Sequence, residues 1–550
     1  MNRNRPRLLI AVILLCFALL TGRVFYFQIV KGVRLAKAAT GQRVANVDFE
    51  KPRGNILDRN GIPLTNRNPK SVIALKPLSL KGKENDLQKI CDILRINYTD
   101  IRRQIGIKRE PILVDTDEES KNQILDMHLE GVSAVNTLKR YDENSVARHL
   151  LGYIKKVDQV GETGIEKAYE DILKIDGENK IGVVTDARYN LLPGIGYRVM
   201  TAESKNSNVM LTLDYHIQRI VEDVLDDHRI TGAVVIEDVT TGDIVAMASK
   251  PDYDQNDVGK FLENSNNALF NRAVASYNLG SIFKIVDVAK YMELNMPTDQ
   301  VYYCPGFIKV GDKEFRCSSY EKGGNGWVNL EEAFSVSCNT YFINMGISMG
   351  HKNIIEMAQR FGFGKTTGIE AQGIPESAGN LPAISKSLTD GNTANIAIGQ
   401  GDVMATPLQV ADLIATVANG GIKNKVNIVD SIVDNELNKK KLIKTQEGSR
   451  VISKDIADYI KTLMEDVTAK GTGTKAHLEE YGGAAGKTGS AETGQYVSGR
   501  KVVHAWFGGY FPQKQPRYSM AVFIEDGKAG GAAAAPIFAE IAQEILKRGL

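Results

Sequence analysis

The sequence predicts an α+β fold with an N-terminal transmembrane helix, a mixed pedestal domain over residues 28–205 and a larger domain over residues 206–550. Three observations support this prediction. A long apolar run follows a short basic N-terminus, a strand-like alternation opens the larger domain at Val209–Leu213, and two more strand-like runs, Ala505–Tyr510 and Tyr518–Glu525, lie near its end. Helical patterns fill the middle, so the sheet takes strands from both ends of the domain, as in an α+β sandwich.

The first element is a membrane anchor. Residues 1–7 are basic and are expected to form a cytoplasmic tail, and residues 8–27 are long enough to span a membrane if Arg23 extends its side chain to the interface. No small-residue cleavage site follows cleanly, which favours an uncleaved signal anchor over a removed signal peptide. Positive charges flank the span on both sides, so their count leaves the orientation open.

The larger domain begins with a strand, a helix and a hairpin. Apolar residues recur at helical spacing from Ile217 to Leu225, and the apolar runs Ala233–Val239 and Ile244–Ala248 flank a turn sequence. The lysine-rich stretch Asn438–Lys444 is expected to form a surface loop. Pro536–Leu550 is expected to form a closing amphipathic helix.

Composition excludes several classes of protein. The chain has 68 Lys and Arg residues against 66 Asp and Glu, and a net charge of +2 argues against a nucleic-acid binder that works by bulk electrostatics. Apolar residues make up 43% and charged residues 24%, which is ordinary for a globular chain and excludes wholesale disorder. Five cysteines in 550 residues are too few for a disulfide-based scaffold.

The first motif with chemical potential is Gly280–Lys284. Ser281 stands near the start of an apolar-periodic stretch, and Lys284 follows one turn later on the same face. A serine hydroxyl becomes a good nucleophile only when a base removes its proton, and a lysine can be that base if burial and nearby positive charge lower its pKa. Alone, the pattern more often marks a capped helix with a surface lysine.

Two further motifs are equally weak in isolation. Ser337-Cys338-Asn339 resembles many helix caps, since Ser and Asn are common at helix N-termini. Lys487–Gly489 lies in a glycine-rich stretch ahead of the strand-like run near residue 505, where Gly489 allows a ligand to approach the backbone closely. Lys487 and Thr488 are suited to hold a carboxylate.

The order and spacing of the three motifs are more specific than any one motif alone. The Ser-x-Asn motif lies 56 residues after Ser281, and Lys-Thr-Gly lies 206 residues after it. This arrangement resembles the class B high-molecular-weight penicillin-binding proteins, which are peptidoglycan D,D-transpeptidases. Four agreements outside the motifs add to the resemblance: residues 51–61, 148–153 and 164–166 in the first half of the chain, and residues 399–401 together with 406–407 in the second.

The sequence departs from that family at three positions. Leu279 stands where relatives often have Pro, Glu492 where they often have Gln, and Asn325 where they often have His. Neither Leu279 nor Glu492 touches a reacting atom in the mechanism that the resemblance implies. No acidic glycosyltransferase-like motif is visible in residues 28–205, which argues against a bifunctional class A protein.

The resemblance implies a serine β-lactamase-like transpeptidase domain, with a central antiparallel sheet flanked by helices, and a catalytic set of five residues. Ser281 would attack the penultimate D-Ala carbonyl of a stem peptide, and Lys284 would take its proton. Ser337 would relay a proton to the leaving amine, Asn339 would orient Lys284 and the donor amide, and Lys487 would keep Lys284 uncharged.

The same resemblance implies a substrate-binding set. Lys487, Thr488 and Gly489 would bind the terminal carboxylate region, and the backbone N–H groups of Ser281 and Ser490 would form the oxyanion hole. A second stem peptide would then take the acyl group, whereas a β-lactam would stall at the acyl stage. This chemistry requires no metal or other cofactor.

The cysteines leave three alternatives open. Cys304 and Cys317 are expected to form a disulfide, to remain free thiols, or to bind a structural zinc ion. A zinc site would need further ligands, and Cys338 and His504 are the candidates because both lie near the active-site motifs.

The resemblance also implies partners and a location. The expected partners are D-Ala-D-Ala stem peptides, β-lactams, the membrane and a polymerising glycosyltransferase, with the catalytic domain outside the cell and no nucleic acid bound. Two alternatives remain: a β-lactamase or β-lactam sensor of the same fold, and a scaffolding cell-wall protein in which catalysis is secondary. The sequence shows no convincing Glu for β-lactamase deacylation.

Overall fold

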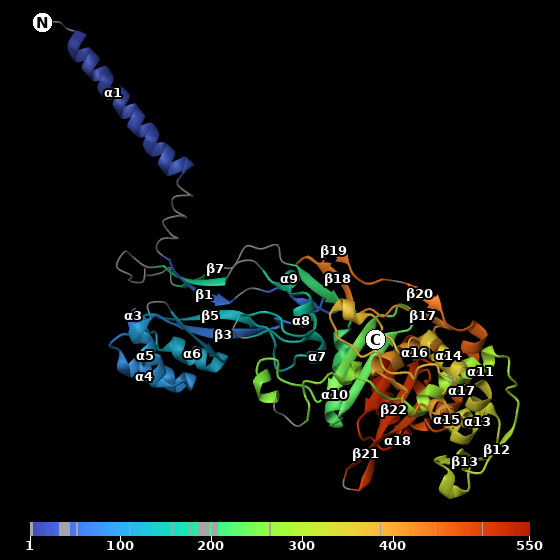
Figure 1. Cartoon of the computed structure of the whole chain (residues 1–550). Coiled ribbons are helices and arrows are strands. Elements are labelled where there is room, and N and C mark those ends of the chain that lie inside the picture. Colours follow the sequence, from blue (N-terminus) through green and yellow to red (C-terminus); the bar gives the residue numbers. More distant parts are fainter. Residues whose placement is uncertain are drawn as a thin grey trace. The chain divides into compact units, whose positions relative to one another are not determined.

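The structure is a computed structural model that describes residues 4–31, 44–50, 53–108, 111–155, 158–175, 179–184, 197–200, 207–262, 266–385, 387–445, 447–497 and 499–550 (Figure 1). The chain divides into two compact units. The first comprises Met1–Arg53, Asn68–Arg140 and Lys174–Lys205, and the second comprises Gly54–Arg67, Tyr141–Leu173 and Asn206–Leu550. Two segments that were expected in the pedestal, residues 54–67 and 141–173, therefore pack with the larger domain.

The first unit contains the N-terminal helix and two small sheets. Helix α1 spans Asn4–Phe25 and continues as a π-helical turn over Tyr26–Val30. Among the described residues, Ile10–Ile29 is the one stretch of helix long and apolar enough to cross a membrane, with a mean hydropathy of 2.2 and no burial. That stretch matches the predicted anchor.

The two sheets of the first unit are antiparallel three-stranded sheets. One has the order β1-β6-β7, and the other has the order β4-β3-β5 and packs through apolar residues against short helices. The elements are β1 (Val44–Glu50), β3 (Asn68–Leu75), α3 (Pro77–Leu80), α4 (Glu84–Leu94), α5 (Tyr98–Ile107), β4 (Ile112–Thr116), α6 (Glu118–Asp126), β5 (Val132–Lys139), β6 (Asn179–Val184) and β7 (Tyr197–Met200).

The second unit is built on a five-stranded antiparallel sheet with the order β10-β9-β23-β22-β21. Its strands are β9 (Gly232–Asp238), β10 (Ile244–Lys250), β21 (Ala485–Val497), β22 (Arg500–Phe511) and β23 (Tyr518–Ile524). The sheet therefore takes strands from both ends of the domain, and the predicted central antiparallel sheet is confirmed. Strand β21 was not predicted, because its glycines make it resemble a turn.

Helices cover both faces of this sheet because successive side chains of each strand point to opposite sides. On one face, Val234, Ile236 and Val522 pack against α10 (Tyr215–Asp227) and α18 (Gly530–Lys547). On the other face, Val235 and Ala521 pack against α16 (Pro407–Ala418), beyond which lie the remaining helices. Figure 1 shows α18 running beside β21 and β22.

The remaining helices and strands of the second unit include the segments that carry the motifs. The helices are α7 (Arg148–Leu151), α8 (Gly164–Ala168), α9 (Glu170–Leu173), α11 (Lys284–Glu293), α12 (Leu330–Ser335), α13 (Asn339–Met349), α14 (His351–Phe361), α15 (Asp390–Ala397) and α17 (Lys454–Ala469). The short strands are β2 (Ile56–Leu57), β8 (Asn208–Leu211), β11 (Tyr277–Asn278), β12 (Tyr302–Cys304), β13 (Phe307–Val310), β14 (Lys313–Arg316), β15 (Gly326–Val328), β16 (Met404–Ala405), β17 (Ile422–Asn424), β18 (Val429–Val433), β19 (Lys439–Leu442) and β20 (Gly448–Arg450).

Two predicted elements differ from the structure. The lysine-rich stretch expected to be a loop forms the exposed strand β19, at the edge of a four-stranded sheet with the order β19-β18-β8-β2. The closing helix begins at Gly530 rather than at Pro536, because Pro536 lies inside α18 near its N-terminal end.

A buried carboxyl group in the central sheet gives the first testable prediction. Glu237 is 1% exposed, and its Oε2 atom has no hydrogen-bond partner among the described residues. Burial, opposed by Lys423 and assisted by Asp238 and Asp243, raises the pKa of Glu237 to about 8. Between the ordinary pKa of a glutamate and pH 8, the Glu237 carboxyl is ionised in the unfolded chain but keeps its proton in the folded protein. The free energy of unfolding therefore falls as pH rises across this window.

Glu237→Gln is therefore expected to stabilise the protein at pH 7.5 by roughly 2–3 kcal/mol and to do little at pH 4. Thermal or denaturant unfolding at both pH values measures the effect. Glu321→Gln, at an exposed position, is the matched control and should change neither value. A destabilised Gln variant at pH 7.5 would show that Glu237 is ionised in the folded state.

Candidate active site

Ser281 lies in a single 3₁₀ turn, Gly280–Phe283, that leads directly into α11. Gly280 makes this turn feasible: it has φ +57°, and a Cβ atom there would lie 2.4 Å from the carbonyl oxygen of Ser490. Its N–H also donates to the carbonyl of Gly399 at 2.9 Å. The glycine therefore lets the nucleophile turn pack directly against strand β21.

Lys284 is the first residue of α11 and its side chain is fully buried. The Nζ atom donates to the carbonyl oxygen of Ser337 at 2.8 Å, to Ser337 Oγ at 3.2 Å and to Asn339 Oδ1 at 2.9 Å. The structure thus brings the first two motifs into direct contact. The hydroxyl of Ser281 makes no hydrogen bond within the described part of the chain.

The Ser-x-Asn motif sits at the junction between α12 and α13. Ser337 has φ +58°, a left-handed conformation that is uncommon for a residue other than glycine. This conformation points both its carbonyl and its hydroxyl at Lys284. Asn339 begins α13, and its Nδ2 atom donates to the carbonyl of Arg316 at 2.9 Å, which fixes the amide so that Oδ1 faces Lys284.

The Lys-Thr-Gly motif lies inside the edge strand β21. Lys487 is fully buried, and its Nζ atom lies 5.4 Å from the ring centroid of Phe334 and donates to the carbonyl of Thr488 at 3.3 Å. Thr488 Oγ1 is 2.6 Å from Thr472 Oγ1. A Cβ atom at Gly489 would lie 2.7 Å from the carbonyl oxygen of Leu279, so only glycine allows this strand to approach the nucleophile turn.

A cavity of about 340 Å³ joins these segments. Its lining includes Ser281, Ser337, Asn339, Thr488 and Ser490, so each of the three motifs contributes. Lys284, Lys487 and Gly489 do not line it and lie behind this surface. Gln400, from a stretch that adds to the family resemblance, also lines the cavity. The remaining walls were not singled out from the sequence: Ser318, Ile398, Thr472, Ala529, Gly531 and Ala532.

Burial shifts the pKa values of both lysines in the direction that general base chemistry needs. Desolvation lowers the pKa of Lys284 to about 8, against opposing contributions from Cys338, Cys317 and Asp287. Desolvation first, and the nearby Lys284 charge second, hold the pKa of Lys487 well below its ordinary value. An uncharged amine can therefore exist at Lys284 near neutral pH, whereas a surface lysine stays protonated.

Asp287 is a buried acid beside this site that sequence reasoning missed. It is fully buried one turn after Lys284 on α11, and neither carboxyl oxygen has a hydrogen-bond partner among the described residues. Burial raises the pKa of Asp287 well above its ordinary value, opposed by Lys284. This shift favours the protonated carboxyl, which limits how strongly Asp287 favours the Lys284 ammonium.

Three of the four cysteine and histidine candidates form one buried cluster. The Sγ atoms of Cys304 and Cys317 are 3.7 Å apart and those of Cys317 and Cys338 are 3.8 Å apart, with all three within 4.8 Å of one another. No sulfur pair is at bonding distance, so all three thiols are free. Asn325 Nδ2 donates to Cys304 Sγ at 3.5 Å.

His504 does not belong to this cluster. It lies on β22, where its ring contacts the rings of Tyr277 and Phe523 at centroid distances of 5.5 and 5.2 Å, and its Nδ1 atom accepts from the N–H of Asp526 at 3.3 Å. The prediction of His504 as a metal ligand was wrong because closeness to the Lys-Thr-Gly motif in β21 does not place a β22 side chain near the cysteines.

Comparison with known proteins agrees with this geometry. Residues 232–543 match the penicillin binding protein transpeptidase domain, and residues 49–191 match the penicillin-binding protein dimerisation domain. The chain is 29% identical to the stage V sporulation protein D of Bacillus subtilis, over 98% of this chain and 85% of that protein. It is 26% identical to the peptidoglycan D,D-transpeptidase MrdA of Acinetobacter baumannii, over 97% of this chain and 86% of that protein.

Solved structures share the fold. The complex between penicillin-binding protein 2 and MreC from Helicobacter pylori matches with a TM-score of 0.67 at 23% identity, covering 92% of this chain and 99% of that chain. A D,D-transpeptidase domain from Eggerthella lenta matches with a TM-score of 0.64 at 24% identity, covering 91% of this chain and 99% of that chain. The chain therefore belongs to the penicillin-binding protein transpeptidase family, as a class B protein with an N-terminal dimerisation domain.

Proposed function

We propose that this protein is a membrane-anchored D,D-transpeptidase that cross-links peptidoglycan stem peptides through an acyl-enzyme on Ser281. The observation that carries the proposal is the buried amine of Lys284, one helical turn from a serine hydroxyl that lines the cavity. Its lowered pKa makes proton transfer from a serine feasible near neutral pH. Burial of an unpaired lysine would otherwise only destabilise the fold.

In the proposed acylation step, Ser281 Oγ attacks the carbonyl carbon of the penultimate D-Ala and its proton moves to the Lys284 amine. The carbon–nitrogen bond to the terminal D-Ala then breaks, and that amine leaves with a proton delivered through the Ser337 hydroxyl, which accepts a hydrogen bond from Lys284 at 3.2 Å. An amine of a second stem attacks the resulting ester, which forms the cross-link and returns the proton to Ser281.

Substrate binding follows from the cavity walls. Thr488 lines the cavity and is expected to hold the donor carboxylate together with Thr472, the hydroxyl 2.6 Å from it. Lys487 lies behind this surface, so we assign it an electrostatic role on the carboxylate and on Lys284 rather than a direct contact. The backbone N–H groups of Ser281 and Ser490 are proposed as the oxyanion hole.

The location follows from the chemistry. Stem peptides are cross-linked outside the cell, so we propose that the N-terminal helix anchors the chain and that the residues after it lie on the outer side of the membrane. A D,D-transpeptidase needs newly polymerised strands, and we therefore propose a polymerising glycosyltransferase as a partner. The Helicobacter pylori structure is a complex of a penicillin-binding protein with MreC, which supports protein partners for members of the family.

The direct test supplies the full chain, in detergent or vesicles, with polymerised glycan strands that carry D-Ala-D-Ala stems. Cross-linked stem dimers and an equal amount of released D-Ala are the expected products, measured by mass spectrometry. A β-lactamase would instead hydrolyse penicillin rapidly and form no dimers. A scaffolding protein would leave the strands unchanged and keep its cellular role when Ser281 is replaced.

We also propose that Cys304, Cys317 and Cys338 bind a structural zinc ion. Their sulfur–sulfur distances of 3.7 and 3.8 Å match the edge of a tetrahedron built on zinc–sulfur bonds of about 2.3 Å, which is about 3.8 Å. The hydrogen bond between the thiols of Cys317 and Cys338 lowers the pKa of Cys338, against the effect of burial, and raises the pKa of Cys317. The pair therefore favours one thiolate, the form of cysteine that zinc binds. Such an ion would hold Ser337 and Asn339 in place through Cys338.

Zinc binding predicts a measurable stoichiometry. Protein purified without chelators is expected to contain about one zinc ion per chain by inductively coupled plasma mass spectrometry, and chelation should lower the melting temperature by several degrees. Cys317→Ser should lose the ion, whereas Cys91→Ser, at a buried cysteine of the first unit, should keep it. A metal-free protein whose mass is two daltons below that of the thiol form would identify a disulfide instead.

A further inference from the structure

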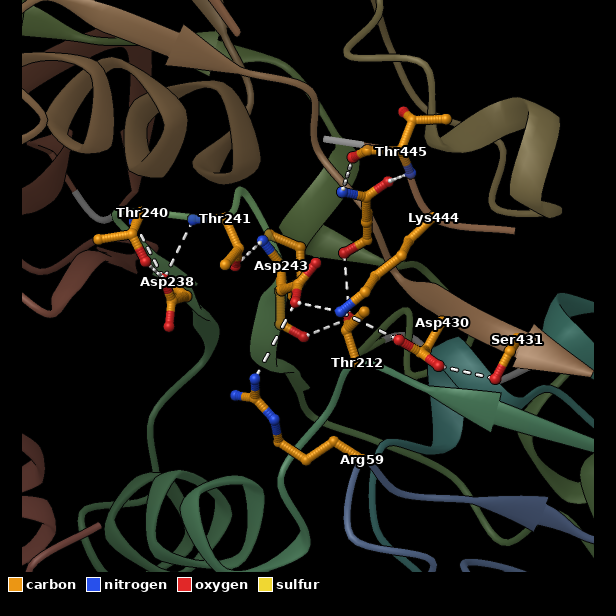
Figure 2. A network of polar contacts seen from close by, with 12 residues as sticks. Arg59, Thr212, Asp238, Thr240, Thr241, Asp243, Asp430, Ser431, Lys444 and Thr445 are labelled. Atoms are coloured by element: carbon orange, nitrogen blue, oxygen red, sulfur yellow. Dashed lines mark hydrogen bonds and ion pairs between the residues drawn. The ribbon is translucent and has the colours of Figure 1, made fainter. Parts of the chain in front are cut away.

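A second cavity lies in the same unit as the active site but shares no lining residue with it. Its volume is about 430 Å³, within the range of sites for small ligands. The walls come from four separate parts of the chain: the turn after β2, strand β8, the start of β10, and the β18–β19 region with the residues that follow it. Figure 2 shows four of the charged residues that meet there: Arg59, Asp243, Asp430 and Lys444.

Most of the charge in this cavity is internally balanced. Lys444 Nζ lies 3.2 Å from a carboxylate oxygen of Asp243 and 3.0 Å from one of Asp430, and Lys439 Nζ lies 2.8 Å from the other oxygen of Asp430. Two ammonium groups thus neutralise two carboxylates, both of which are at least nine-tenths buried. Figure 2 shows Lys444 between the two aspartates.

Arg59 supplies the remaining charge. Its guanidinium faces Asp243 Oδ2, the same oxygen that Lys444 contacts (Figure 2), but the nearest distance is 4.0 Å, beyond a hydrogen bond. The side chain is 29% exposed and donates no hydrogen bond within the described part of the chain. The cavity therefore presents one unbalanced positive charge and the planar set of donors that matches a carboxylate in a bidentate fashion.

The cavity also has an apolar wall. Met210 and Leu437 line it, and Leu437 is 45% exposed, which leaves an apolar surface open beside the charged residues. Leu437 adopts φ +64° and packs over Gly61, where an added Cβ would lie 2.9 Å from its side chain. Leu437 takes this left-handed conformation in the turn of the β18–β19 hairpin, and the turn holds its side chain at the cavity.

We propose that this cavity is a second ligand site, which binds the carboxylate of a small, partly apolar acylamino acid or peptide through Arg59. Arg59 lies in the segment of residues 51–61 that resembled a family motif and that the proposed acyl transfer does not use. The inference goes beyond the proposed function and does not depend on it, because none of the groups involved takes part in the chemistry at Ser281.

The test is a calorimetric titration of the full chain in detergent micelles after acylation with benzylpenicillin, which blocks the cavity at Ser281. Mass spectrometry first measures the fraction of protein that is acylated. A protein that benzylpenicillin does not acylate would contradict the proposed function but not this inference. N-acetyl-D-alanine is expected to bind with one saturable site per chain. N-acetyl-D-alaninamide, which lacks the charge, is expected to bind at least tenfold more weakly. If a soluble muropeptide binds more tightly than N-acetyl-D-alanine, the carboxylate comes from a peptide stem. If the muropeptide binds more weakly, the carboxylate comes from a free acylamino acid.

Two variants and a control locate the site. Arg59→Gln and the cavity-filling Leu437→Trp should each weaken binding at least tenfold. Arg219→Gln removes a guanidinium that pairs with Asp223 at 3.0 Å on the surface of α10, and it should leave binding unchanged. Absence of saturable binding, equal affinity for the acid and the amide, tighter binding of inorganic phosphate, or unaltered binding in both variants would overturn the proposal.

Discussion

Replacing Ser281 by Ala is expected to abolish covalent labelling by penicillin and to stop cross-link formation, with activity reduced by at least about 10³-fold. Its hydroxyl lines the cavity together with Ser337 and Thr488, and Ser281 belongs to the turn that leads directly into Lys284. Removing one oxygen atom from a half-buried position should leave the folded structure unchanged. The measurements are intact mass after exposure to a β-lactam and cross-linked dimers per unit time.

Ser348→Ala is the matched control, because Ser348 is an exposed serine on α13 whose hydroxyl donates only to the carbonyl of Met345. It should be acylated at the wild-type rate. Undiminished labelling of the Ser281→Ala protein would mean that another residue is the nucleophile. Loss of labelling together with unchanged growth of a strain that depends on this protein would favour the scaffolding role.

Replacing Lys284 by Gln is expected to lower the second-order rate constant of acylation by about 10²–10⁴-fold while leaving Ser281 in place. The amine is the base in the proposed mechanism, and its three acceptors on Ser337 and Asn339 hold it in one position. Gln keeps part of those hydrogen bonds but cannot accept the serine proton. Lys290→Gln, on the same helix, removes a lysine that pairs with Glu293 at 2.8 Å and should have little effect.

The pH dependence of acylation follows from the same residue. Only the neutral amine accepts a proton, and the pKa of Lys284 is about 8, so the rate constant should rise about tenfold for each pH unit below that value and level off above it. Stopped-flow or mass-spectrometric acylation rates between pH 5.5 and 9 measure the profile. A rate that is constant across this range, or one that falls as pH rises, would contradict a lysine base.

The sequence predicts contacts best where the residues involved are close together in the chain. Ser281 and Lys284 are three residues apart at a helix start, so their proximity follows from helical geometry alone. The contact between Lys284 and Asn339 spans 55 residues and could be inferred only from the resemblance to a family. Four strands of the central sheet were expected from their apolar runs, but β21 was not, because the glycines that allow its close approach to the nucleophile turn also make it resemble a turn.

Other features depended on tertiary packing that no pattern encodes. Cys338 joins Cys304 and Cys317 because α13 packs near β12 and β14, whereas His504 is held in the sheet by Tyr277 and Phe523. Asp287 is an acid one turn after Lys284 in an otherwise apolar run, which is the signal that could have singled it out. The return of residues 54–67 to the larger domain follows from parallel pairing of β2 with β8, a long-range contact.

The proposed chemistry depends on one hydroxyl made reactive by a buried, uncharged amine, and peptide mapping after β-lactam exposure tests this most directly. We expect a single adduct, with the mass of the intact drug, on the peptide that contains Ser281, and we expect it to persist for many minutes. An adduct on a different residue, or complete turnover of the drug with no adduct trapped at any time, would contradict the assignment of Ser281 and Lys284 as nucleophile and base.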